Sequence, residues 1–137
     1  MDVVQLPFCA LIGVQRAEDG ALSLPGDAKY GNHLGTVHAG ALLTLAETAS
    51  GDFLLREFGD VGLPVVPVVR RLEAKFRKPA QGAVRAVATL APEAKAEFLA
   101  ALTTKGRALI VVTVDVTDEH GAHALSATIE WFVARRE

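Results

Sequence analysis

The sequence predicts an α+β fold in which a curved, mainly antiparallel sheet packs against one long helix. Residues 38–58 carry the 3.6-residue period of an amphipathic helix, whereas four later segments alternate apolar and polar residues with a period of two. Turn residues separate those segments at spacings typical of hairpins. Because an antiparallel sheet of this kind has one covered face, we expect the long helix to cover it.

Composition places the chain among ordinary globular domains. The chain has 137 residues, half of them hydrophobic and 22% charged, so it can form a packed core, and we treat residues 1–137 as one domain. The net charge of −2 and the pI near 6.1 disfavour nucleic acid or anionic lipid as a partner. No apolar run reaches the ~18 residues of a membrane span.

The compartment expected from the sequence is the cytoplasm. The first twenty residues have neither a charged leading region nor a cleavage signature, which disfavours secretion. Cys9 is the only cysteine, so it cannot form an internal disulfide. We interpret Cys9 as a small buried side chain in preference to a thiol nucleophile.

The segments before the long helix have weaker patterns. Residues 8–17 predict a short strand, and the turn Glu18-Asp19-Gly20 leads to a second, weaker strand with the sequence Ala-Leu-Ser-Leu-Pro. Residues 26–37 contain three glycines and several small polar residues, so we expect a loop.

The helix predicted over 38–58 has two unlike faces when its residues are placed at 100° per position. The apolar face contains Leu42, Leu45, Ala46, Ala49 and Phe53, and the small, weakly polar face contains Gly40, Thr44, Glu47, Thr48 and Gly51. A helix face turned to water normally carries many long charged side chains, yet no Lys or Arg occurs between Lys29 and Arg56. We therefore expect the Glu47 face to meet a protein surface or a ligand.

Four segments after the helix predict strands, and one short helix lies among them. The predicted strands cover 68–78, 83–90, 107–117 and 123–134. The short helix is expected to start at Pro92, to run to about residue 102 and to stop at Gly106. We expect the first two strands to form one hairpin and the last two to form another. The apolar rows are Val68, Leu72, Ala74 and Phe76; Val84, Ala86, Ala88 and Leu90; Ala108, Ile110, Val112, Val114 and Val116; and Leu125, Ala127, Ile129, Trp131 and Val133.

The residues around the start of the long helix resemble a known family. Residues 35–40 read Gly-Thr-Val-His-Ala-Gly, and Glu47 follows the histidine by nine residues within Leu-Ala-Glu-Thr-Ala-Ser-Gly. This arrangement resembles the hotdog-fold thioesterases and is closest to their phenylacetate-pathway-like branch. Residues 76–82 resemble the strand end and turn that this family places after its helix, and residues 92–108 resemble an insertion in its uncharacterised relatives. The likeness extends from about residue 10 to residue 134.

The resemblance implies a hotdog fold and an acyl-CoA thioesterase that needs neither a metal nor a redox cofactor. It assigns Glu47 to the thioester carbonyl, as general base for a water or as nucleophile. It places an oxyanion donor at the amide of Ala39, and it gives Asn32 an orienting role. Our leading interpretation adds the amide of Gly40 as a second oxyanion donor. The family more usually has glycine at the position of Ala39. The alanine keeps the backbone N–H and adds a methyl group.

Elementary physical chemistry supports such a site independently. Thioester hydrolysis builds negative charge on the carbonyl oxygen, and a helix N-terminus offers free N–H groups and the positive end of the macrodipole. Glu47 lies about two turns beyond Gly40 on the same face, and with a rise of ~1.5 Å per residue we expect it to reach a water beside the carbonyl. A carboxylate on a dry face should have a raised pKa, which suits a general base.

Several of these residues have a second interpretation. Glu47 is alternatively a surface carboxylate on an ordinary amphipathic helix. His38 is interpreted as a turn-forming residue, whose hydrogen bond fixes the backbone that aims the Ala39 amide, in preference to a catalytic base. No cluster of His, Cys, Asp and Glu has metal-ligand spacing, so no metal site is expected. The pattern of a phosphate-binding nucleotide loop is also missing.

Five further residues are candidate substrate contacts. Thr44, Thr48 and Gly51 either line the acyl pocket or allow the close approach of a partner helix. Arg77 and Lys78 either contact the phosphates of coenzyme A or are solvated charges on the open face of a strand.

The leading functional prediction is an acyl-CoA thioesterase that acts as a homodimer or as a dimer of dimers. One copy would leave strand edges and the Glu47 face uncovered, and related proteins pair two copies edge to edge and build each active site from both. The second hypothesis is a non-catalytic acyl-CoA sensor. A hotdog dehydratase or hydratase ranks third, because its His-containing loop signatures are missing. The acyl group stays open, as does the choice between coenzyme A and an acyl carrier protein.

Overall fold

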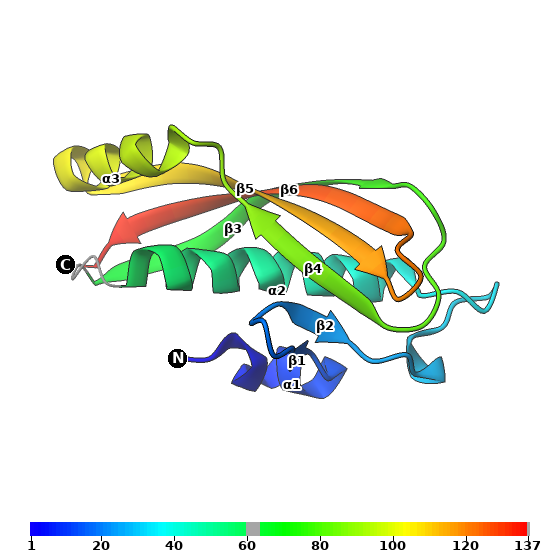
Figure 1. Ribbon diagram of the computed structural model, residues 1–137. Coiled ribbons are helices and arrows are strands. Elements are labelled where there is room, and N and C mark those ends of the chain that lie inside the picture. The colour runs from blue at the N-terminus through cyan, green and yellow to red at the C-terminus, as the bar shows by residue number, and fades with distance from the viewer. Residues whose placement is uncertain (60–63, 137) are drawn as a thin grey trace.

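The computed structural model describes residues 1–59 and 64–136 (Figure 1). Its elements in chain order are the 3-10 helix η1 (Val3–Gln5), α1 (Pro7–Ile12), β1 (Gln15–Arg16), β2 (Leu22–Leu24), the 3-10 helix η2 (Ala28–Tyr30), α2 (Ala39–Phe58), β3 (Val65–Phe76), β4 (Val84–Thr89), α3 (Ala94–Lys105), β5 (Arg107–Asp118) and β6 (His123–Arg135). No helix in this part of the chain is long and apolar enough to cross a membrane.

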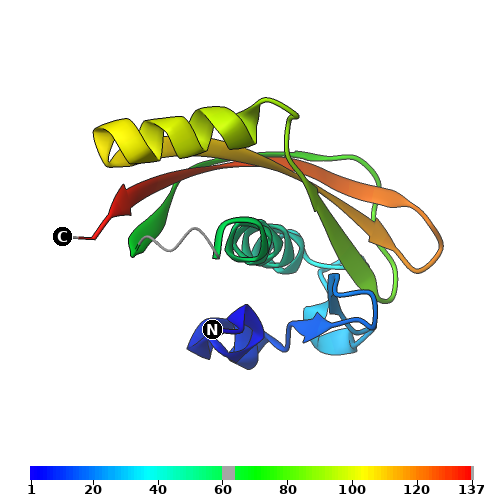
Figure 2. The same ribbon diagram turned by 60° about the vertical axis from the view of Figure 1, so that its left-hand side comes forward.

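Within the described residues, the strands form one six-stranded antiparallel sheet in the order β1-β2-β4-β5-β6-β3. The sheet curves over one side of α2, while η1 and α1 lie on its other side, so α2 sits between two layers (Figure 2). This arrangement confirms the predicted α+β hotdog fold with one central helix and a short helix before the last hairpin.

The core lies between α2 and the concave face of the sheet. The predicted apolar stripe of α2 is buried at Leu42, Leu45, Ala46 and Ala49. The predicted inward rows of β5 and β6 are buried along their whole length.

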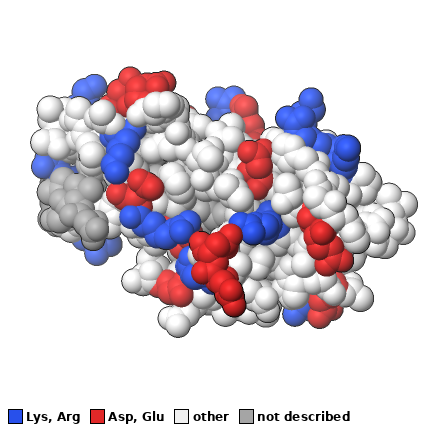
Figure 3. All heavy atoms as spheres, viewed as in Figure 1, with Lys and Arg blue, Asp and Glu red and all other residues white. Residues whose placement is uncertain are grey.

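On the face shown in Figure 3, acidic and basic side chains are interspersed over the surface and do not gather into one basic patch.

The predicted hairpin between segments 68–78 and 83–90 is wrong, whereas the other predicted hairpin is confirmed as β5–β6. β3 pairs with β6, and β4 pairs with β2 and β5. The connection from β3 to β4 crosses the end of the β5–β6 hairpin and is tied down there. Val37 donates its N–H to the Ala80 carbonyl at 2.9 Å, and the Gln81 N–H donates to the Asp118 carboxylate at 3.0 Å.

The strand predicted over 8–17 is mostly a helix. Residues 7–12 form α1, and only Gln15 and Arg16 form a strand. Pro7 occupies the first helical turn, where its fixed φ suits a helix and its missing N–H is no loss. Gly13 ends the helix with φ of 91° and donates its N–H to the Cys9 carbonyl at 2.9 Å. These start and stop signals outweigh the β-like composition of the short apolar run between them.

The apolar row predicted for the first long strand is also partly wrong. The register of β3 shifts between Val69 and Arg71, which marks a bulge. Residues directly opposite each other share a face of the sheet. Leu72 lies opposite Ile129 of the inward row, while Val68 lies opposite Phe132, next to inward-facing residues. Val68 therefore faces outward, because one extra residue reverses the alternation.

The short helix predicted from Pro92 is present as α3 with somewhat different bounds. It begins at Ala94, and Gly106 closes it with φ of 75°. Phe98 and Leu102 are its buried residues, and the Phe98 ring lies 4.7 Å from the ring of Phe58, centroid to centroid. α3 thus adds an apolar wall beside the C-terminal end of α2.

Candidate active site

The N-terminus of α2 is built by His38, Ala39 and Gly40. His38 is the N-cap residue, and its Nδ1 accepts the Gly40 N–H at 2.8 Å. The structure thus places His38 in the hydrogen-bonding role and engages the Gly40 amide, which was predicted as an oxyanion donor. Within the described part of the chain, the Ala39 amide has no hydrogen-bond partner. Ala39 therefore supplies the N–H that is available to a ligand.

Asn32 lies in the loop that leads to α2, and its side chain holds this loop together. Its Oδ1 accepts the N–H groups of Leu34 and Thr36 at 2.9 and 3.0 Å, and its Nδ2 donates to Thr36 Oγ1 at 2.8 Å. An amide nitrogen carries two hydrogens, so one is left for a ligand. The geometry gives Asn32 a role in shaping the loop, with a single donor to spare for orienting a substrate.

Two carboxylates on α2 have opposite surroundings. Asp52 is buried and paired, because Arg16 contacts its two oxygens at 2.8 and 3.0 Å and Arg56 contacts it at 3.2 Å. Glu47 is half-buried and, among residues 1–59 and 64–136, has no cationic partner. Burial raises the pKa of the Glu47 carboxyl above its ordinary value. A desolvated, unpaired carboxylate of this kind suits a general base.

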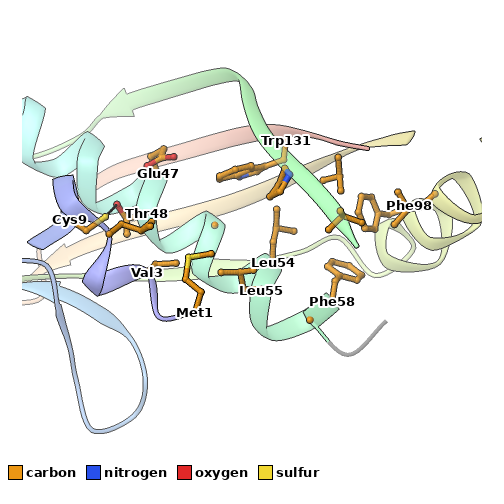
Figure 4. Close-up of a pocket in the computed structure, with 17 residues that line it drawn as sticks. Met1, Val3, Cys9, Glu47, Thr48, Leu54, Leu55, Phe58, Phe98 and Trp131 are labelled. Carbon is orange, nitrogen blue, oxygen red and sulfur yellow. Dashed lines mark hydrogen bonds between the residues drawn. The ribbon is translucent and has the colours of Figure 1, made fainter. Parts of the chain in front are cut away.

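An apolar cavity of about 510 Å³ opens beside Glu47. Its walls come from the C-terminal half of α2, from η1 and α1, from β3 and β6, and from α3. Glu47 lies at one end of the cavity and Phe98 at the other, with Trp131 between them (Figure 4). Glu47 is the one acidic or basic side chain among the described lining residues. The volume lies within the roughly 300–1,000 Å³ of small-molecule sites.

Two of the three small residues proposed as substrate contacts on α2 line this cavity. Thr48 and Gly51 are lining residues, whereas Thr44 lies outside the described lining and donates its hydroxyl to the Gly40 carbonyl at 2.8 Å. Thr48 donates its own hydroxyl to the Thr44 carbonyl at 2.7 Å, so the Cys9 thiol is the donor in its 3.6 Å contact with Thr48. Cys9 is therefore the small buried side chain that the sequence predicts.

Trp131 forms a wall of the cavity, although its position in the sequence predicts only a core residue of the last strand. Its Nε1–H donates to Ser50 Oγ at 2.9 Å, and Ser50 donates to the backbone carbonyl of Glu47 at 2.7 Å. Gly51 makes room for the indole, since a Cβ there would lie 3.1 Å from a ring carbon of Trp131. The small residues on this side of α2 thus admit an indole ring. The one signal for this in the sequence is that the only tryptophan of the chain falls in a predicted inward row.

Replacing Ser50 with alanine should destabilise the protein by about 1–3 kcal/mol, because the buried Trp131 N–H would lose its acceptor. Urea unfolding followed by far-UV circular dichroism measures this change without relying on Trp131 fluorescence. Thr104→Ala is the matched control, because Thr104 makes the same kind of hydroxyl-to-backbone bond on an exposed helix face. If Ser50→Ala loses no more stability than Thr104→Ala, the hydrogen bond between Ser50 and Trp131 does not have the stabilising role given to it.

Arg77 and Lys78 follow β3 and lie outside the described lining of the cavity. Arg77 donates its Nε–H to Ser126 at 2.8 Å. Ser126 and Asp115 both contact the Nε2 atom of His123, at 3.1 and 2.9 Å. A Ser-His-Asp relay needs both ring nitrogens, so this cluster does not form one. No group of His, Cys, Asp and Glu suited to a metal ion occurs among the described residues.

The free amide and the acid are far apart within one copy of the chain. From Ala39 to Glu47 the helix rises about 12 Å, at 1.5 Å per residue. The glutamate side chain has only three C–C bonds of about 1.5 Å between Cα and its carboxyl carbon. To connect the Ala39 N–H with the Glu47 carboxylate over about 12 Å, the thioester carbonyl, the attacking water and the extended glutamate side chain would have to lie almost in a straight line. The reach within one chain is thus less favourable than the sequence suggested.

The fold and this site define the class of protein: a hotdog domain with an unpaired acid on its central helix beside an apolar cavity. Residues 12–133 match the family described as a domain of unknown function, DUF4442, and the chain belongs to this family. None of the curated proteins matches the chain.

Solved structures are similar to nearly the whole chain. PA5026 from Pseudomonas aeruginosa, described as a protein of unknown function and "probable thioesterase", is 27% identical with a TM-score of 0.84, over 98% of this chain and 91% of that one. The BH2602 protein from Bacillus halodurans, solved with CoA, is also 27% identical, with a TM-score of 0.70. The similarity covers 92% of this chain and 74% of that one. A thioesterase from Staphylococcus aureus, SAV0944, shares the fold at 18% identity with a TM-score of 0.70. The similarity covers 94% of this chain and 99% of that one. The chain therefore belongs to the hotdog superfamily that contains these proteins.

Proposed function

We propose that this protein hydrolyses acyl-CoA thioesters to a free acid and coenzyme A, with Glu47 activating the water. The observation that supports this most is the half-buried, unpaired carboxylate at one end of an apolar cavity. Similarity to a probable thioesterase and to a protein solved with CoA agrees with it. The proposed compartment is the cytoplasm, where a free thiol such as Cys9 stays reduced.

The proposed reaction has two steps. Glu47 takes a proton from a water as its oxygen bonds to the thioester carbonyl carbon, and the negative charge moves to the carbonyl oxygen, held by the Ala39 N–H. The intermediate then collapses, the C–S bond breaks, and the protonated Glu47 returns its proton to the leaving thiolate. The products are one carboxylic acid and one thiol. Direct attack by Glu47 would instead expel the thiolate and form a mixed anhydride, and water that attacks the glutamyl carbonyl of this anhydride would place a labelled oxygen atom in the protein during a single turnover.

We infer that a second copy of the chain completes the site. Within one copy, the Ala39 amide and Glu47 lie about 12 Å apart along α2. β3 is a twelve-residue edge strand, and on its inward row Phe76 is 49% exposed and Val69 is 37% exposed. A long edge with exposed apolar side chains favours pairing with another strand. A homodimer, with or without further pairing of dimers, would bring an amide of one copy near the acid of the other.

Arg77 and Lys78 are proposed to contact the phosphates of coenzyme A. The hydrogen bond between Val37 and Ala80 ties the chain just after these residues to the loop that enters α2. The two basic side chains therefore lie at the end of the fold where α2 begins. Both are exposed, and the two terminal nitrogens of Arg77 stay available when its Nε–H is bonded to Ser126. A carrier phosphate there would leave the acyl group directed toward Glu47 and the cavity.

Thiol release from a panel of acyl-CoAs tests the proposal directly. The panel covers acetyl to hexadecanoyl chains and includes phenylacetyl-CoA, because the motif around His38 resembles the phenylacetate-pathway-like branch. We expect saturable release of coenzyme A from at least one member, above the rate without protein. Saturable binding of acyl-CoA without any thiol release would contradict hydrolysis and would instead support the acyl-CoA sensor.

A further inference from the structure

The cavity beside Glu47 is long, and Phe58 and Phe98 line the end that is distant from the acid (Figure 4). Thr48, Gly51, Leu54, Leu55 and Phe58 line it from α2, at the spacings that place residues along one side of a helix. From Glu47 to Phe58 the helix rises about 16 Å, at 1.5 Å per residue. The space therefore runs lengthwise along α2, away from the end where the free amide of Ala39 lies.

Two aromatic rings from different helices pack against each other at this end. Phe58 of α2 and Phe98 of α3 have centroids 4.7 Å apart, with their ring planes at 53°. Phe98 is only 4% exposed although it lines the cavity, and Leu102 on the next turn is 3% exposed. α3 thus contributes buried side chains to this end of the cavity, and Phe98 is the one that contacts the Phe58 ring.

We propose that this cavity takes a straight acyl chain of medium length and that Phe98 sets the longest chain accepted. The inference rests on the proposed function, since it names the substrate class of the same site. A C–C bond of about 1.5 Å advances an extended chain by roughly 1.25 Å, so about 16 Å accommodates on the order of ten to twelve carbons. An aromatic acyl group would fill only the part near Glu47 and Trp131.

Volume and chemistry agree with this length. A methylene is similar in size to a water, which occupies about 30 Å³ in the liquid, so a twelve-carbon chain needs on the order of 360 Å³. The cavity of about 510 Å³ exceeds this volume, so the length of the cavity along α2, and not its volume, sets the limit. Each methylene moved from water into the cavity should tighten binding about fourfold, until the chain reaches the Phe58–Phe98 end.

Trp131 provides the measurement, because it is the only tryptophan of the chain and lines the cavity. S-alkyl-CoA thioethers with 4 to 16 carbons serve as probes, since they lack the carbonyl that hydrolysis requires. We expect Trp131 fluorescence to report binding that tightens about fourfold per carbon up to about ten to twelve carbons and then stops improving. In Phe98→Ala the improvement should continue for three or more further carbons.

Leu99→Ala is the matched control, because Leu99 lies next to Phe98 on α3, is partly buried and is not a described lining residue. Phe98→Leu is made beside Phe98→Ala and should show a smaller extension, which keeps the test valid if the alanine variant does not fold. Equal length profiles in the folded Phe98 variant and the Leu99 control would overturn the inference. So would fluorescence that does not respond to chain length in the wild type.

The two proposals fail in different ways. Length-limited thioether binding without thiol release from the matching acyl-CoA would remove hydrolysis and leave the length limit in place. Thiol release combined with binding that is independent of chain length would remove the length limit and leave hydrolysis in place.

Discussion

Replacing Glu47 with glutamine should lower kcat for thioester hydrolysis by at least about 10²-fold and leave KM within a few-fold of the wild type. A general base contributes roughly 10²–10⁴ to the rate, and glutamine keeps the shape of the side chain while losing the ability to take a proton. Because Glu47 would act in the chemical step more than in binding, the loss should appear in kcat. The measurement is steady-state thiol release from the best substrate of the panel.

Glu57→Gln is the control for this variant, because Glu57 is an exposed acid on the same helix and is not a described lining residue. It should keep kcat near the wild-type value.

A stability measurement separates a chemical effect of Glu47→Gln from unfolding. Burial raises the pKa of Glu47 in the folded state, so the folded protein holds this proton more tightly, and the group opposes folding as the pH rises through that pKa. Glu47→Gln should therefore melt no lower than the wild type at neutral pH. An unchanged kcat in Glu47→Gln would contradict the assignment.

Replacing Asp52 with asparagine should cost about 2–3 kcal/mol of folding free energy, near the lower end of values for breaking a buried ion pair. The Asp52 side chain is 6% exposed, and it holds both Arg16 and Arg56. Arg16 is partly exposed, so water compensates some of the loss when its partner is removed. Arg16 also contacts Asp2 and the Gly20 carbonyl, so the same change loosens the N-terminal layer that forms part of the cavity wall.

Asp19→Asn is the matched control for Asp52. Asp19 pairs with Arg85, but both side chains are about half exposed, so solvent screens this pair and it should contribute little to stability. Chemical denaturation of the two variants beside the wild type gives the comparison. A loss in Asp52→Asn no larger than that in Asp19→Asn would show that the Asp52–Arg16 contact does not hold the N-terminal layer to α2.

The parts of the fold that sequence could predict are those with strong local signals. The α2 helix follows from the spacing of Leu42, Leu45 and Ala49, whose side chains return to one face every three or four residues. The β5–β6 hairpin follows from two long alternating segments around a four-residue turn. In both cases, contacts between residues near in sequence decide the structure.

The features that sequence missed depend on contacts between distant segments. No residue near β3 indicates that β6 lies beside it. The pairing partner of β3 depends on where the connection from β3 to β4 runs, and that connection is held by hydrogen bonds to Val37 and Asp118. The bulge at Val69–Arg71 is likewise a property of the β3–β6 pair. The wrong strand prediction over 8–17 differs in kind, because Pro7 and Gly13 are local helix signals in the sequence and the prediction gives more weight to the apolar composition between them.

The burial of Glu47 could be predicted from the sequence, whereas the cavity beside it could not. The lone Glu47 on a weakly polar helix face indicated a dry environment, and burial at that position agrees with it. The cavity could not be predicted, because its walls come from η1, α1, α3 and two strands that are distant in the sequence. The engagement of the Gly40 amide by His38 is a matter of side-chain orientation that spacing does not reveal.

The pH dependence of kcat/KM for thioester hydrolysis tests the role of Glu47 most directly. A general base works only when deprotonated, so kcat/KM should fall as the pH drops, with a midpoint above the ordinary glutamate value of 4.5 because burial raises the pKa of Glu47. We expect this acid limb in the wild type and in Glu57→Gln, and a flat residual rate over the same range in Glu47→Gln. An acid limb that persists with the same midpoint in Glu47→Gln would assign the proton transfer to another group and contradict the account.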